Sequence, residues 1–268
     1  MSTLDFIIAL FCRIDEAMQG VNKRKNAQLY PSELVTIACL WALKGGSTRA
    51  FYRWLKRDYL CLFPHLTERT RLFRAIAKHR EWAMVFLCEQ TFFSIADSFS
   101  IELIHPRREG RSDKQIGKKG KSNGRWIVGA KFVALINQYG LISDWDYDSA
   151  NVADNAFDES VIGCHESGEE GTCTFSDNGF HRSKKRGGDP SNLVICQRGQ
   201  RNERMLVETV FSLLTGVLHL KRLYQRVWDY LEARLGFTVA VYNLLVLWDG
   251  LVTDDNGRTR LSIAEFAL

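Results

Sequence analysis

The hydrophobic and polar positions of residues 1–90 follow the period of α-helices. Apolar residues recur at helical spacing from Leu4 to Met18, and Thr3 stands where an N-cap is expected. A second helix is predicted to begin at Pro31, because proline is tolerated at a first helical position. It is predicted to end at Gly45-Gly46, since glycine readily adopts the conformation that terminates a helix.

Two further predicted helices are amphipathic and have basic outer faces. One begins after Ser47-Thr48 and the other follows Thr67. Their outward cations are Arg49, Arg53, Lys56 and Arg57 on the first, and Arg69, Arg71, Arg74 and Lys78 on the second. Short helices with basic faces can form a DNA-binding bundle, although an ordinary bundle with a solvated surface gives the same pattern.

The pattern changes near residue 92, where the period of β-strands replaces that of helices. Ser94 to Ile101 alternates between apolar and polar residues, and Gly129 to Asn137 is an apolar strand. Leu141 to Tyr147 follows a turn at Gln138-Tyr139-Gly140, which predicts a hairpin.

Beyond this hairpin, short strands alternate with helices. Asn151 is positioned to cap a helix that begins near Val152, with Asp154 completing the cap. The other predicted elements are strands at Thr172–Ser176 and Leu193–Cys196 and helices at Glu203–Leu218 and Tyr230–Trp248. The whole pattern predicts an α/β fold in which helices cover both faces of a mixed sheet.

The net charge of +5 conceals a segregation of charge along the chain. Eight Lys or Arg residues lie between Arg107 and Arg125, against two acidic residues. Nine Asp or Glu residues and no Lys or Arg lie between Asp144 and Glu170. Such segregation suggests a surface that meets a polyanion, although charge runs are often only solvated faces.

Several classes of protein are disfavoured. No run approaches eighteen apolar residues, so no membrane span is expected, and the apolar stretch from Phe6 to Cys12 lacks the flanks of a signal peptide. Seven scattered cysteines fit a reducing cytosol better than a disulfide framework. A zinc site is the alternative use of some of them, without the paired short spacings of zinc modules. Its ligands would be Cys164, His165, Cys173, His181 and Cys196.

Asp97 is an anomaly in the pattern of its strand. It shares a face with Ile95, Phe99 and Ile101, and this face is expected to be buried. A lone carboxylate there costs several kcal/mol unless it is paired, hydrogen-bonded or bound to metal. An edge position, a different register or a structural role toward the backbone would also explain it.

Asp177 and Glu208 also stand at informative positions. Asp177 follows a predicted strand and precedes the turn signal Asn178-Gly179, at the strand end where sheets of this class place their chemistry. A turn-initiating aspartate is the alternative. Glu208 lies with Arg204 and Thr215 on the polar stripe of an otherwise apolar helix. A solvent-exposed stripe with a helix ion pair is the alternative, but Arg four residues before Glu is the weaker orientation for such a pair, which slightly favours another use.

Taken together, the three carboxylates indicate a metal site. An Asp in a first strand, an Asp that ends a later strand and a Glu on the next long helix can meet at one sheet edge. Oxygen ligands of this kind suit Mg²⁺ or Mn²⁺ rather than zinc. Two such ions can activate an attacking oxygen and stabilise a leaving one in phosphodiester chemistry.

At this point the sequence resembles the bacterial insertion-sequence transposases with a DDE catalytic domain of the ribonuclease-H-like fold. The matching stretches are Ala96–Phe99, Trp126–Lys131, Ser149–Asp154, Ser176–Phe180 and Arg204–Ser212. They occur in family order over roughly residues 92–250. The resemblance implies that Asp97, Asp177 and Glu208 bind metal and that Lys131 and Arg204 face DNA near the active site. Thr215 stands where many relatives have a lysine, which leaves the subgroup open.

Two basic segments are expected to hold DNA without reading its sequence. The first lies between the first two strands and is expected to be a flexible loop. Its candidate contacts are Arg107, Arg108, Arg111, Lys118, Lys119 and Lys121, and those of the second segment, after Asp177, are Arg182, Lys184 and Lys185.

The sequence as a whole predicts a cytoplasmic DDE transposase. Residues 1–90 are expected to form a helical DNA-binding domain, residues 91–252 the ribonuclease-H-like catalytic domain and residues 253–268 a C-terminal tail. The enzyme would bind the terminal inverted repeats of its element, use Mg²⁺ (or Mn²⁺) to free a 3′-hydroxyl and direct it at target DNA, at least as a homodimer on DNA. The alternatives are an inactive DNA-binding derivative and a nuclease that cuts without joining.

Overall fold

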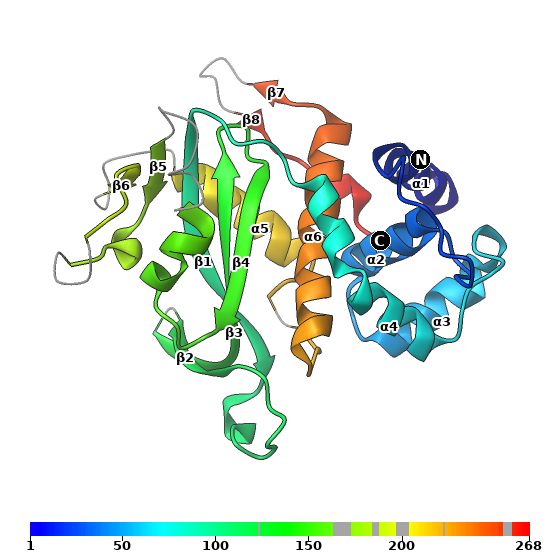
Figure 1. The fold of residues 1–268 in the computed structure, drawn as a ribbon, viewed down its shortest axis with the longest axis horizontal. Helices are drawn as coiled ribbons and strands as arrows, with labels where there is room; N and C mark the ends of the chain where they lie inside the picture. The colour runs from blue at the N-terminus through cyan, green and yellow to red at the C-terminus, as the bar shows by residue number, and fades with distance from the viewer. Residues whose placement is uncertain (123, 163–172, 184–187, 197–203, 222, 254–258) are drawn as a thin grey trace.

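The computed structural model describes residues 1–122, 124–162, 173–183, 188–196, 204–221, 223–253 and 259–268. Figure 1 shows the N-terminal helices on one side and a β-sheet on the other, with the long helix α6 between them. The chain is therefore a mixed α/β protein with an open sheet.

The N-terminal helices confirm most of the predicted boundaries. They are α1 (Thr3–Ala17), α2 (Pro31–Lys44), α3 (Thr48–Asp58) and α4 (Arg69–Lys78), with 3₁₀ turns η1 (Leu60–Leu62) and η2 (Arg80–Phe86). The cap of α1 is Ser2 rather than Thr3, because the Ser2 hydroxyl accepts a hydrogen bond from the Asp5 N–H. Gly45 ends α2 with a φ of 65°, as the glycine pair predicted.

The sheet is mixed, and strand β3 pairs with other strands along both of its edges. Its strands are β1 (Phe93–Ile104), β2 (Lys118–Ser122), β3 (Arg125–Asn137), β4 (Ile142–Ser149), β5 (Cys173–Ser176) and β6 (Leu193–Ile195). One edge of β3 pairs antiparallel with β1, and the other pairs antiparallel with β2 and then with β4. Strand β5 pairs parallel with β1, and β6 pairs parallel with β5.

The prediction of a flexible basic loop before β3 is wrong for part of that segment. Lys118–Ser122 forms the edge strand β2, paired along its length with the start of β3. Gly120 allows this arrangement, because a Cβ at that position would lie 2.0 Å from the Ala150 carbonyl oxygen. Exposed lysines suit an edge strand, since they discourage pairing with another chain.

The two faces of the sheet are covered differently from the prediction. Helices α5 (Arg204–Gly216) and α6 (Trp228–Asp249) belong to the main core on one face. In the described chain the other face carries only η4 (Asp154–Phe157), the π-helical turn η5 (Asp158–Ile162) and η7 (Asn178–Phe180). The α-helix expected near Val152 is therefore replaced by 3₁₀ and π turns, and Asn151 caps no helix.

Helix α6 joins the sheet to the N-terminal helices. Asn243 donates hydrogen bonds to the carbonyls of Phe86 and Ile142, and its own side-chain oxygen accepts from the Ile142 N–H. The buried Arg234 donates to the carbonyls of Ala42 and Leu218. One hydrophobic core runs through both halves. The proposed domain boundary near residue 90 stays a prediction.

Helix α6 is long and apolar enough to cross a membrane by length and composition, but 78% of its apolar window is buried inside the protein. This is the behaviour of a core helix. The end of the chain also packs: after the short strands β7 (Val252–Thr253) and β8 (Thr259–Arg260), the 3₁₀ turn η9 (Ala264–Phe266) places Phe266 against Phe6 and Trp248.

Candidate active site

Asp97 and Asp177 occupy matching positions on neighbouring parallel strands. The register pairs Phe93 with Cys173 and Ile95 with Phe175. Continued by two residues, the same register sets Asp97 beside Asp177, which directly follows β5. Neighbouring strands lie roughly 4.8 Å apart, and side chains at matching positions share a face. The register therefore predicts that two carboxylates 80 positions apart in the sequence lie near each other on the sheet.

Both carboxylates also bond to local backbone. Asp97 Oδ1 accepts a hydrogen bond of 2.7 Å from the Ser98 N–H, and Asp177 Oδ1 accepts one of 2.8 Å from the Gly179 N–H. Both side chains are half-buried. The bonds restrict the rotation of each carboxylate, so the local structural role and a ligand role are compatible at both positions.

Helix α5 runs along β1 in the same direction as that strand. Near the start of the helix, Leu206 lies against Gly140 in the turn at the end of the sheet where β1 begins. Further along, the ring of Phe211 lies 4.8 Å from that of Phe99, in an edge-on arrangement. Phe99 shares its strand face with Asp97, so α5 covers the face that carries the two aspartates.

Glu208 lies on α5 between these two contacts. It precedes Phe211 by three residues, and residues at that spacing lie on the same side of a helix. Its level along β1 is therefore that of Asp97. The Glu208 side chain is exposed. Helix α5 thus lies over the sheet face that carries Asp97, and the approach of Glu208 to the two aspartates stays a prediction.

A complete metal cage is not assembled among the described residues, because no three His, Cys, Asp or Glu side chains there lie close enough to hold an ion. The aspartate pair has the hard oxygen donors that Mg²⁺ and Mn²⁺ prefer, and such ions commonly take further ligands from water and substrate phosphate. A divalent ion at Asp97, Asp177 and Glu208 therefore stays a prediction. Of the zinc alternative, Cys164 and His165 lie outside the described residues.

Asp154, which the sequence predicts to complete a helix cap, also lies in this region. Its Oδ1 accepts a 2.6 Å hydrogen bond from the Ser98 hydroxyl, next to Asp97 in the chain, and lies 2.9 Å from Lys131 Nζ. A Cβ built on Gly179 would lie 2.6 Å from Asp154 Oδ2 and 2.9 Å from Asp177 Oδ1. Asp154 therefore contacts both the strand that carries Asp97 and the turn that holds Asp177.

Lys131 has a partner inside the protein. Its side chain is only 13% exposed and pairs with Asp154 on the face of β3 that also carries Val133. The expected contact of Lys131 with DNA stays a prediction, and the structure shows a second use for the charge. Arg204 is the first residue of α5, and its side chain lies outside the described part of the chain.

Arg182 is likewise held by the protein. Its Nε lies 2.7 Å from Asp158 Oδ2, its Nε–H and Nη2–H donate to the Asn155 carbonyl, and its Nη1–H donates to Glu159. Burial raises the pKa of Asp158 to about 6, and Arg182 opposes that rise. The side chain of Arg182 is 21% exposed, so it braces the loop after Asp177. Lys184 and Lys185 lie outside the described residues.

The basic segment before β3 presents its cations to solvent. The exposed side chains are Arg107, Arg108, Arg111, Lys118, Lys119 and Lys121. Lys119 lies 3.8 Å from Glu109 and 5.3 Å from the centre of the Trp126 ring. Trp126 is itself 57% exposed. Cations beside an exposed indole form a surface on which a nucleic-acid backbone could lie.

Comparisons of the chain with protein-family models, with curated proteins and with solved structures each found no match.

Proposed function

We propose that the protein is a metal-dependent DDE transposase that cuts DNA at the ends of an insertion sequence and joins the freed 3′-hydroxyl to target DNA. The observation that carries the proposal is the parallel pairing of β1 with β5, whose register, continued by two residues, would set Asp97 beside Asp177. The open mixed sheet, with antiparallel strands followed by parallel ones, is compatible with a ribonuclease-H-like fold.

Each element of the site has a role in the proposal. Asp97 and Asp177 hold the divalent ion, Mg²⁺ or Mn²⁺, and Glu208 contributes a ligand from α5. The bound ion supplies charge stabilisation at the reacting phosphate and lowers the pKa of an attacking oxygen. Asp154 is a positioning residue, because it contacts both the β1 strand and the turn after β5 without being one of the three ligands.

The partners in this proposal are the terminal inverted repeats of the element and a target duplex. The exposed cations of the 107–121 segment contact phosphates, and two copies of the chain hold two DNA ends together. The reaction takes place in the cytoplasm. The apolar helix that is buried in the core and the lack of disulfides among the described cysteines are compatible with that location.

The test is a strand-cleavage assay on DNA that flanks the gene, with and without Mg²⁺. Asp97→Asn, Asp177→Asn and Glu208→Gln are expected to retain DNA binding and to lose cleavage by at least about a thousandfold. Matched controls are Asp15→Asn and Glu16→Gln, because both residues are exposed on α1, outside the sheet. Isothermal titration with Mn²⁺ gives a readout that does not depend on activity, since each site variant should bind the ion more weakly.

Each other outcome supports a different function or removes one residue from the site. Retained cleavage in one site variant removes that residue from the metal site. DNA binding without any cleavage by the unmodified protein favours an inactive DNA-binding derivative. Cleavage without joining, when pre-nicked ends are supplied with target DNA, favours a nuclease. Zinc found by metal analysis of the purified protein would support the structural zinc alternative.

A further inference from the structure

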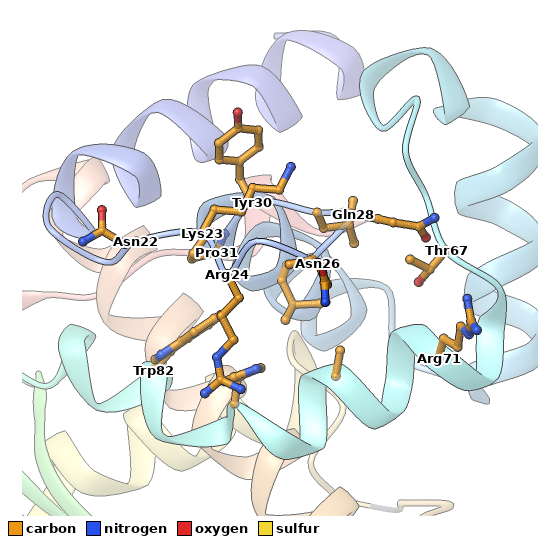
Figure 2. A pocket seen from close by; sticks show the side chains of 15 residues that line it. Asn22, Lys23, Arg24, Asn26, Gln28, Tyr30, Pro31, Thr67, Arg71 and Trp82 are labelled. Atoms are coloured by element: carbon orange, nitrogen blue, oxygen red, sulfur yellow. The ribbon is translucent and has the colours of Figure 1, made fainter.

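A cavity of about 410 Å³ opens in the N-terminal half, away from the carboxylates. Figure 2 shows it between the segment that precedes α2 and helix α4, with Trp82 toward one end of the view and Arg71 and Thr67 toward the other. Its volume lies within the roughly 300–1,000 Å³ of small-molecule sites. A single nucleotide is of a size that such a space can hold.

The charge of the lining is positive. Lys23, Arg24 and Arg71 line the cavity, and no Asp or Glu is among its lining residues. Among the described residues, none of these three cations lies within 4.0 Å of an acidic side chain. Arg71 interacts electrostatically with the exposed Glu68, which does not line the cavity. Cations gathered in a concave surface attract a phosphate group.

The lining also offers aromatic and amide groups. Tyr30 is 55% exposed, and Lys23 Nζ lies 4.0 Å from the centre of its ring. On the side of η2, the ring of Trp82 stacks against that of His79 at 4.1 Å. The side chains of Asn26 and Gln28 line the same space and can both donate and accept hydrogen bonds. Aromatic rings beside cations and amides are suited to a nucleobase and its phosphate.

The segment that precedes α2 and lines the cavity is held in place by packing and by hydrogen bonds. Leu29 is buried in the core, and the Tyr30 N–H donates a 2.7 Å hydrogen bond to the Glu33 carboxylate at the start of α2. A 2.9 Å backbone bond from the Ala27 N–H to the Arg24 carbonyl closes a turn before it. The cavity is therefore formed before any ligand arrives, which lowers the entropic cost of binding.

We propose that this cavity binds one unpaired nucleotide of a DNA strand, with the phosphates on its two sides at Arg24 and Arg71, which lie toward opposite ends of the cavity in Figure 2, and its base against Tyr30. The proposal rests on the proposed function, since it gives the N-terminal half a contact with the same DNA. The basic helix faces predicted from the sequence are thereby extended by a cavity that takes an unpaired nucleotide of the DNA strand. A free nucleotide has the same chemistry, so the experiment must separate the two sources.

The experiment measures fluorescence anisotropy of labelled DNA at fixed salt, comparing a blunt duplex with the same duplex carrying a short single-stranded end. The unmodified protein is expected to prefer the single-stranded end by about tenfold, the order of one base stacked on an aromatic ring. Arg24→Ala with Arg71→Ala should abolish the preference. Tyr30→Ala should reduce it, and Tyr30→Phe should restore it, since the ring rather than the hydroxyl is invoked.

The matched control is Lys25→Ala, an exposed cation in the same segment that does not line the cavity. If Lys25→Ala lowers the preference as much as Arg24→Ala with Arg71→Ala, or if no preference exists, the proposal is overturned. It is also overturned if free dAMP binds with the same dependence on Arg24 and Arg71 while single-stranded ends do not. Cleavage of the blunt duplex is measured separately, so loss of the preference with retained Asp97-dependent cleavage rejects this inference alone. A preference without metal-dependent cleavage rejects only the proposed function.

Discussion

Lys131 and Asp154 form a 2.9 Å ion pair on the face of the sheet opposite to Asp97. The pair is largely shielded, since the two side chains are 13% and 24% exposed. Asp154 comes from η4, so the pair fastens a short 3₁₀ turn to the central strand. It also brings Asp154 against Ser98 and Gly179, the neighbours of the two aspartates of the site.

Asp154→Asn is expected to lower the free energy of unfolding by about 1–3 kcal/mol, because Lys131 would keep its charge with little access to water. Urea denaturation measures the loss. Adding Lys131→Met should recover most of it, which a double-mutant cycle would show as coupling. Asp146→Asn is the control, since the Asp146 carboxylate accepts a hydrogen bond from its own neighbour, the Tyr147 N–H. An equal loss in that control would contradict a specific role for the pair.

Removing four cations from the basic segment should change the salt dependence of DNA binding. Replacing Arg107, Arg108, Lys118 and Lys119 with Ala is expected to reduce the slope of log K against log salt by about 3.6, since each phosphate contact contributes roughly 0.9. All four side chains are exposed, so unfolding temperature should stay unchanged. An unchanged slope would show that this segment does not contact phosphates.

Asp144 is expected to make stability depend on pH. Burial raises the pKa of its carboxyl to about 6, and the nearby Asp146 adds to the rise while the bond from the Trp145 N–H opposes it. The folded state therefore binds more protons than the unfolded state between about pH 4 and 6, so stability falls as pH rises through that window. Asp144→Asn removes this dependence.

The variant should be more stable than the unmodified protein by about 1–3 kcal/mol at pH 8, with no difference below about pH 4. Asn can still accept the hydrogen bond from the Trp145 N–H, so the local geometry is retained. Denaturation at several pH values measures the difference. Asp148→Asn is the exposed control on the same strand. A difference that is constant with pH would contradict the assignment.

Gly45 and Gly46 offer a paired test of how the N-terminal helices join α5. Both have positive φ, 65° and 74°, but only at Gly45 would a Cβ meet another residue, the His219 ring at 2.5 Å. Gly46→Ala should cost about 1 kcal/mol from backbone strain. Gly45→Ala should cost clearly more, because His219 must also move. Equal unfolding temperatures for the two variants would show that the His219 contact has no energetic weight.

The parts of the fold that follow from local patterns were predictable. The glycine pair ends α2, and the alternation of residues defines β1 and places Asp97 on the face with Ile95 and Phe99. Because the side-chain period of a strand is two, that parity survives errors in the strand ends. Asp97 and Asp177 could be named from sequence, but their alignment depends on the pairing of β1 with β5, which no local pattern fixes.

Other features escaped prediction because they arise from tertiary contacts. Lys118–Ser122 is rich in charge and glycine, yet it becomes a strand by pairing with β3. Asp154 was predicted to complete a helix cap, but its carboxylate accepts a hydrogen bond from Ser98 and pairs with Lys131, and a 3₁₀ turn follows instead of an α-helix. The cavity at Arg24 and Arg71 also joins residues far apart in sequence, so only the folded chain reveals it.

The position of α6 has a consequence for how a strand of DNA would be measured. Asn243 ties η2 to the sheet, and Arg234 ties α2 to the end of α5, so the nucleotide cavity and the carboxylate pair belong to one continuous packed body. A body of this kind acts as a ruler: a strand held in the cavity and cut at Asp97 would be cut at a constant number of nucleotides from the held one. Inserting nucleotides into the DNA between the held nucleotide and the original cut would change which bond is cut. The number of nucleotides between the held one and the cut would stay the same.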